Sequence, residues 1–197
     1  MNSFGCVIER KSEDETIIEV EFEPLGGGRS SKSTLFRNAN FRYFDLDREI
    51  LLFASDSEFG IRPSRDSSLE PWDLKWKDIQ AVTMGVGWLA VANDELIKVY
   101  DLLGHPIKSI AFDRQVVAMR AHENMLAVVF HEGIPMWGAQ QLAVQLYLVD
   151  GKRNQTYLIH TIHVPVKPGQ QLKWIGFSQE GMLFSQDTLG TIRCLSL

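Results

Sequence analysis

The sequence is short of cysteines, of basic residues relative to acidic ones, and of long apolar runs, and each shortage excludes a class of protein. Two cysteines, Cys6 and Cys194, are too few for a disulfide scaffold or a structural zinc site. With 20 Lys and Arg against 25 Asp and Glu, the net charge of -5 argues against electrostatic capture of nucleic acid. No apolar run approaches the roughly 20 residues that a membrane-spanning helix needs. We therefore expect reduced thiols, no membrane span and no direct binding to DNA.

What the sequence does contain is the composition of a globular domain. Hydrophobic residues make up 45% of the 197 residues and charged residues 23%, which is typical of a chain that folds rather than of a disordered one. This length suits one domain and is sufficient to bury a sizeable core. The first residues lack the basic-then-apolar layout of a secretory signal.

A weak internal repeat is the main organising feature of the chain. Four segments share a turn followed by a short apolar strand, and each contains a leucine at the same step of the motif. Leu52, Leu89 and Leu126 follow one another at intervals of 37 residues, and Leu183 comes 57 residues later. The longer last interval indicates an insertion in the third unit. We expect the four leucines to occupy equivalent, buried positions in successive repeat units.

Each unit contains further strands around this motif. Period-two alternation of apolar and polar residues marks strands with one buried face, as in residues 97–100, 144–148 and 192–195. The unit is therefore four short strands in roughly 40 residues, and no stretch has a long helical pattern. Four antiparallel strands at this period predict an all-β fold, a β-propeller with about four blades. A β-sandwich and a plain barrel are the alternatives, but neither explains a repeat of this length.

The N-terminal part is less regular than the repeats. Residues 4–9 and 16–22 predict a hairpin around a charged turn, and residues 40–45 predict another strand. Residues 55–70 are polar and contain Pro63, which argues against a strand there. Asp45, Asp47 and Glu49 precede the first repeat strand, and we interpret them as solvated turn residues.

No pattern of catalytic or metal-binding residues emerges from the sequence. His122 and His131 flank a strand without the further ligands that a zinc site needs. No serine lies in a nucleophile elbow, and no nucleophile, base and orienting group can be assembled. We expect no catalytic residue, no metal and no cofactor. An enzyme built on a propeller, with carboxylates or histidines at the inner strand ends, is the competing hypothesis from another class.

The tryptophans divide into two groups. Trp88 and Trp174 lie within strand motifs and are expected in the core, and Trp72 with Asp73 resembles the dipeptide of WD repeats. Met136 and Trp137 lie instead in the insertion between two strands of one unit. Apolar residues in a loop either contact a partner or pack on the loop itself, and the sequence leaves both interpretations open.

Several motifs, in this order, resemble one known family. They are residues 2–5 with 19–22, 85–92, 119–122 with 126–131, 142–146 and 174–181. The chain resembles the middle, SepB-type propeller of the replisome adaptor family that binds DNA polymerase alpha. This family is known in animals as the WD-repeat and HMG-box or acidic nucleoplasmic DNA-binding protein. Its fungal members are the chromosome transmission fidelity and minichromosome loss proteins.

The resemblance implies a domain organisation and a function. Family members carry an N-terminal WD-repeat propeller, a six-bladed middle propeller with a helical bundle, and in animals an HMG box. Residues 1–197 correspond to a partial middle propeller without the other parts, which implies a fragment, a truncated form or a paralogue. The implied function is a non-catalytic nuclear scaffold that links DNA polymerase alpha to subunits of the replicative helicase, as a homotrimer in the full domain. A generic WD-type interaction module outside replication is the alternative.

Overall fold

The computed structural model of the chain consists of short antiparallel sheets. It describes residues 5–11, 16–22, 32–37, 40–47, 49–64, 67–136, 138–151 and 153–195. These residues form strands and no helix, so none of them belongs to a helix that could cross a membrane. The strands of these described residues form five sheets, which we call blades 1 to 5 in chain order.

Blades 1 and 5 have three strands and the others have four. Blade 1 contains β1 (Gly5–Lys11), β2 (Thr16–Phe22) and β3 (Lys32–Arg37). Blade 2 contains β4 (Tyr43–Leu46), β5 (Ile50–Ala54), β6 (Glu58–Pro63) and β7 (Trp72–Lys75). Blade 3 contains β8 (Ala81–Gly85), β9 (Trp88–Ala92), β10 (Leu96–Asp101) and β11 (Pro106–Ala111). Blade 4 contains β12 (Val116–His122), β13 (Met125–His131), β14 (Leu142–Asp150) and β15 (Gln155–Val164). Blade 5 contains β16 (Leu172–Phe177), β17 (Leu183–Asp187) and β18 (Ile192–Leu195).

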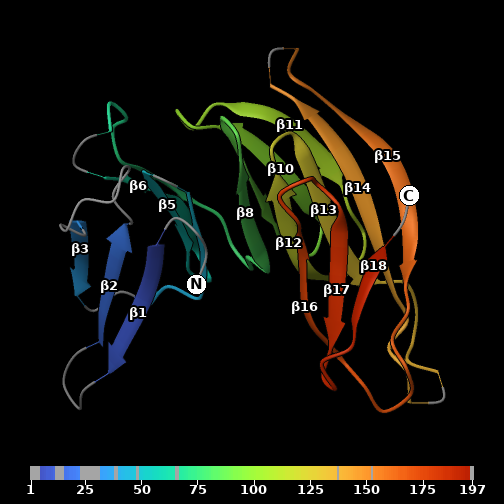
Figure 1. Cartoon of the computed structure of the whole chain (residues 1–197). Coiled ribbons are helices and arrows are strands. Elements are labelled where there is room, and N and C mark those ends of the chain that lie inside the picture. The colour runs from blue at the N-terminus through green and yellow to red at the C-terminus, as the bar shows by residue number, and fades with distance from the viewer. Residues whose placement is uncertain are drawn as a thin grey trace.

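The blades stand side by side in chain order, from the N-terminal blade 1 to the C-terminal blade 5 (Figure 1). The first strands of successive blades contact one another, β1 with β4, β4 with β8, β8 with β12 and β12 with β16. Each blade is therefore an antiparallel meander that runs outward from an inner strand, which is the arrangement of a β-propeller. The all-β propeller prediction is confirmed. The four blades found from the repeat are blades 2 to 5, and the N-terminal hairpin forms blade 1 together with β3.

Four apolar clusters fill the spaces between neighbouring blades. Because successive side chains of a strand point to opposite faces, a strand inside a blade contributes alternate residues to the clusters on its two sides. In β9, Leu89 packs toward blade 2, and Trp88 and Ala90 pack toward blade 4. Both faces of such a strand are buried, and for this reason its sequence is a continuous apolar run, as in β9.

The prediction of four equivalent leucines is right for three of them. Leu89, Leu126 and Leu183 are buried and each packs against the preceding blade. Leu52 is also buried, but it packs toward the following blade, and Leu51 takes the equivalent position instead. The expectation that Leu52 belongs to this set is therefore wrong by one residue. A shift of one residue along a strand moves the side chain to the opposite face of the sheet.

The expectation that Pro63 argues against a strand in residues 55–70 is also wrong. Strand β6 pairs with β5 and β7, and Phe59 and Ile61 are fully buried within it. Pro63 is the last residue of this strand, so its missing N–H removes no hydrogen bond from the middle of the sheet.

Candidate interaction sites

The inner strands surround a cavity of about 740 Å³. All five blades contribute residues to its wall, so it lies where the axis of the propeller runs. The wall mixes charged, aromatic and backbone groups. Its members are Cys6, Val7, residues 44–47, residues 83–86, residues 120–123, Trp174 and residues 176–179.

Asp45 joins two blades at the wall of this cavity. Its carboxylate accepts hydrogen bonds from the Thr83 hydroxyl at 2.9 Å and from the backbone N–H of Met84 at 2.8 Å. Burial raises the pKa of the Asp45 carboxyl above its usual range, and these hydrogen bonds and the charge of Arg120 oppose the rise. The interpretation of Asp45 as a solvated turn residue is wrong. It lies in β4, and its carboxylate is occupied by donors from blade 3.

Arg120 and His122 supply positive and titratable groups on the β12 side of the cavity. The Arg120 guanidinium donates a hydrogen bond to the carbonyl of Met119 at 2.9 Å. The His122 ring stacks on the Phe177 ring with 5.6 Å between centroids. These contacts place His122 as a packing residue between blades 4 and 5. Among the described residues, no three His, Cys, Asp or Glu side chains gather in a way that could hold a metal ion.

The tryptophans differ in their roles. Trp88 is buried as expected, and its indole N–H donates to the carbonyl of Glu123 in blade 4 at 3.0 Å. Trp72 forms the same kind of bond between blades 2 and 3, to the carbonyl of Leu102 at 2.9 Å. The expectation that Trp174 lies in the core is wrong, because 43% of it is exposed at the cavity wall.

The insertion of blade 4 lies between β13 and β14 and presents apolar side chains. Ile134 is exposed, and Met136 is 57% exposed although its backbone pairs with Ala139. The loop is anchored to the segment that leads into blade 5, since the Gly169 N–H donates to the carbonyl of Gly138 at 2.9 Å. Trp137, the other residue expected here as a partner contact, lies outside the described residues.

One surface was not found from the sequence pattern. In strand β15, the consecutive residues Tyr157, Leu158 and Ile159 are all exposed. A signal was available in the distribution of charge. Residues 151–179 contain no Asp or Glu, although the chain as a whole is acidic.

Comparison with known proteins places the chain in a family over its full length. The model of the Mcl1 middle region of the minichromosome loss protein matches residues 1–197. The human WD repeat and HMG-box DNA-binding protein 1 is 31% identical over 99% of this chain and 18% of its own length. The Arabidopsis thaliana protein ENHANCER OF LHP1 1 is 28% identical over 98% of this chain and 21% of its own length. The chain thus spans about a fifth of the length of these curated relatives.

Solved structures confirm the fold at low sequence identity. Kluyveromyces lactis Hsv2 with its loop 6CD replaced by a Gly-Ser linker is 13% identical, with a TM-score of 0.65 over 90% of this chain and 56% of that one. BBS1N in complex with ARL6DN is 16% identical, with a TM-score of 0.57 over 98% of this chain and 66% of that one. The full-length match of the family model, the relative at 31% identity and the propeller agree. The chain belongs to the family of the Mcl1 middle region of the minichromosome loss protein.

Proposed function

We propose that this chain is a non-catalytic protein-interaction module of eukaryotic DNA replication, acting in the nucleus. The observation that carries the proposal is the match of the Mcl1 middle-region model to all of residues 1–197. The resemblance found in the sequence motifs supports the finer role, an adaptor that links DNA polymerase alpha to the replicative helicase. The same resemblance supports assembly as a homotrimer and the partial-domain organisation of residues 1–197.

The geometry supports a role in binding rather than in catalysis. The Asp45 carboxylate at the axial cavity accepts hydrogen bonds from two neighbouring residues of blade 3 and so holds two blades together. Exposed apolar residues lie instead on the insertion of blade 4, where Ile134 and Met136 project from an anchored loop. We propose that the exposed Met136 and its sequence neighbour Trp137 contact a protein partner, since Met and Trp are enriched in interface cores.

The test uses purified DNA polymerase alpha and purified helicase assembly as probes against the immobilised chain. We expect both probes to bind. We expect Met136→Glu to lower the affinity for at least one of them by about tenfold, as the loss of a buried interface anchor does. Leu103→Glu is the matched control, because Leu103 is 62% exposed in a turn of blade 3. This control should leave both affinities unchanged.

The alternative is an interaction module that acts outside replication. If the wild-type chain binds neither probe, the adaptor role is wrong and this alternative replaces it. If both probes bind and Met136→Glu behaves like Leu103→Glu, the adaptor role stands and the assignment of Met136 is wrong.

A further inference from the structure

The outer edge strands of the blades differ in how they are protected from pairing with other chains. An exposed edge strand offers unpaired N–H and C=O groups, which proteins usually blunt with shortness, charges or proline. Strand β7 has four residues, and Asp73 and Lys75 are among them. Strand β11 begins with Pro106 and carries Lys108. Strand β18 has four residues, including Arg193. Each of these edges is therefore short, charged or interrupted.

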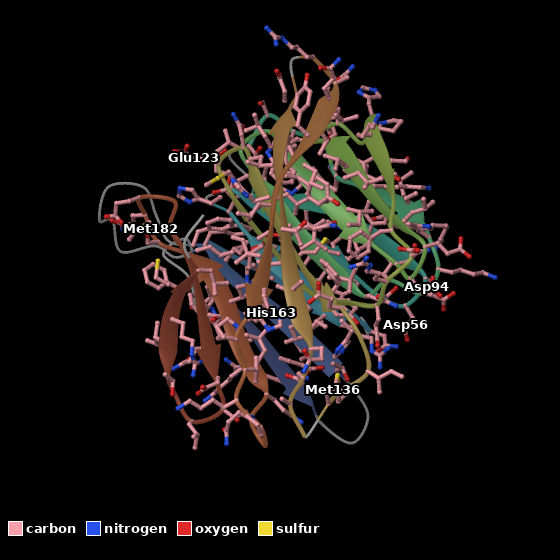
Figure 2. The ribbon with its side chains drawn as sticks, turned by 90° about the vertical axis from the view of Figure 1, so that its right-hand side faces the viewer. Asp56, Asp94, Glu123, Met136, His163 and Met182 are labelled. Carbon is pink, nitrogen blue, oxygen red and sulfur yellow. The ribbon has the colours of Figure 1, made fainter. Side chains whose placement is uncertain are left out.

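Strand β15 has none of these protections. It is ten residues long, lies at the end of its sheet, and contains no Lys, Arg, Asp, Glu or Pro. Most of its residues are β-branched or aromatic, which favours extended backbone. The only interruption is a register shift opposite Leu146 and Tyr147, which leaves Ile159 without a directly paired residue on β14. Figure 2 shows this side of the molecule, with His163 of β15 toward the viewer.

The exposed apolar residues of β15 follow one another along the edge and lie on both faces of the sheet. Leu158 is 52% exposed, and Tyr157 and Ile159 beside it are exposed as well. Tyr157 pairs with Leu148 of β14, which is also exposed, so the apolar surface continues onto the neighbouring strand. In the described part of the chain, no hydrogen bond reaches the backbone of β15 from the side away from β14.

The stretch of sequence that contains β15 has more basic than acidic residues. Residues 151–179 hold four of the 20 Lys and Arg residues and none of the 25 Asp and Glu. Lys108 of β11, the strand of blade 3 that contacts β15, adds to them. Two acidic side chains next to this strand have partners: the Asp150 carboxylate lies 3.7 Å from the Arg153 guanidinium, and the Glu132 carboxylate lies 3.4 Å from the His163 ring. The strand therefore has an apolar run at its centre, and the sequence around it, which we call the basic surround, holds an excess of basic residues.

We propose that β15 is a docking edge for an extended, acidic peptide segment of a protein partner, which adds to blade 4 as a fifth strand. Backbone hydrogen bonds along the edge supply the affinity, as in other cases of strand addition. The apolar residues Tyr157, Leu158 and Ile159 contact apolar side chains of the peptide on the two faces of the extended sheet. The basic surround selects acidic residues of the peptide. Docking at this edge does not depend on the replication role.

The test measures binding of three labelled octapeptides to the chain by fluorescence anisotropy. The first alternates Val with Glu, the second alternates Val with Lys, and the third is the Val-Glu peptide with N-methyl groups on alternate residues. We expect the Val-Glu peptide to bind. We expect the Val-Lys and N-methylated peptides to bind at least about tenfold more weakly, because they lose charge complementarity and the backbone hydrogen bonds respectively.

Two variants of Ile159 locate the site. Ile159→Glu and Ile159→Lys remove the same exposed apolar side chain and differ only in charge. We expect Ile159→Glu to lower the affinity for the Val-Glu peptide by about tenfold, and we expect Ile159→Lys to lower it much less. Urea unfolding of both variants checks that they fold as the wild type does, and Ile192→Glu on the β18 edge is the control for another edge.

Three results would overturn the proposal. One is equal binding of the Val-Glu and N-methylated peptides, which would exclude strand addition. Another is an equal effect of both Ile159 substitutions, or an effect of Ile192→Glu as large as that of Ile159→Glu. The third is a concentration-dependent dimer of the chain in sedimentation that Ile159→Glu dissolves while no peptide binds, which would make a second copy the occupant.

Discussion

Asp45 shows at the scale of one residue how a buried carboxylate holds two blades together. Its oxygens accept hydrogen bonds from Thr83 and Met84, which lie in the first strand of the next blade. Loss of hydration penalises the charged form, and this raises the pKa of the carboxyl above its usual value. The folded state therefore binds the proton of Asp45 more tightly than the unfolded state does.

This raised pKa makes a prediction for Asp45→Asn. The stability that protonation of Asp45 contributes is fully present at a pH below the ordinary Asp pKa of about 3.9, which applies to the unfolded chain. It is lost as the pH rises through the raised pKa of the folded state. The free energy of unfolding of the wild type, minus that of Asp45→Asn, should therefore decrease as the pH rises from about 4 through the raised folded value. Urea unfolding of both proteins across this range measures the difference, and an increase with pH would contradict the assignment.

Asp101→Asn is a control of opposite sign for the same measurement. Burial raises the pKa of the Asp101 carboxyl, but hydrogen bonds from His105 and Leu103 outweigh burial and hold it below its usual value. Its contribution is therefore present above the ordinary value and is lost as the pH falls through the folded value. The free energy of unfolding of the wild type, minus that of Asp101→Asn, should therefore decrease as the pH falls through that folded value.

At the scale of the elements, the contact between β8 and the turn of blade 4 depends on a residue without a side chain. A Cβ atom on Gly85 would lie 2.3 Å from the Trp88 ring and 2.5 Å from the carbonyl oxygen of Glu123. Neither neighbour can move freely, because the Trp88 indole N–H donates to that carbonyl. The Val86 N–H donates to the same oxygen at 3.0 Å, so the turn is held at two points.

Gly85→Ala should therefore destabilise the chain by about 1–3 kcal/mol, as overpacking of a rigid contact does. Gly133→Ala is the matched control, because a Cβ atom there meets no atom within 4 Å. We expect that control to change the free energy of unfolding by less than about 0.5 kcal/mol. Urea unfolding measures both, and equal stability of the two variants would show that the contact can relax.

At the scale of the whole molecule, the net charge makes a prediction about DNA. The human relative is named a DNA-binding protein, and this chain spans 18% of its length. With a net charge of -5, this chain should bind duplex DNA no tighter than about 1 μM at physiological salt. Fluorescence anisotropy with a labelled duplex measures this affinity. Salt-sensitive binding in the submicromolar range would contradict the prediction and would point to residues 151–179 as the binding surface.

Local pattern was sufficient to predict many of the strands and much of the core, although it argued against the strand β6. The alternation of side chains along a strand is a property of the backbone, so Leu89, Leu126 and Leu183 could be assigned to buried positions from spacing alone. The insertion with Met136 could be placed between two strands of blade 4 in the same way. Leu52 was assigned to the wrong face, because a shift of one residue leaves the apolar pattern unchanged where both faces are buried.

Exposure and pairing between distant strands were decided only by the tertiary structure. Trp174 has the sequence environment of a core residue, yet it lies exposed at the wall of the axial cavity. Asp45 looks like a turn residue until Thr83, 38 positions away, donates to it. The open edge of β15 depends on which strand comes last in its sheet. Sequence determined the local alternation, which arises within each strand, whereas burial and edges arise from contacts between segments that the chain brings together only on folding.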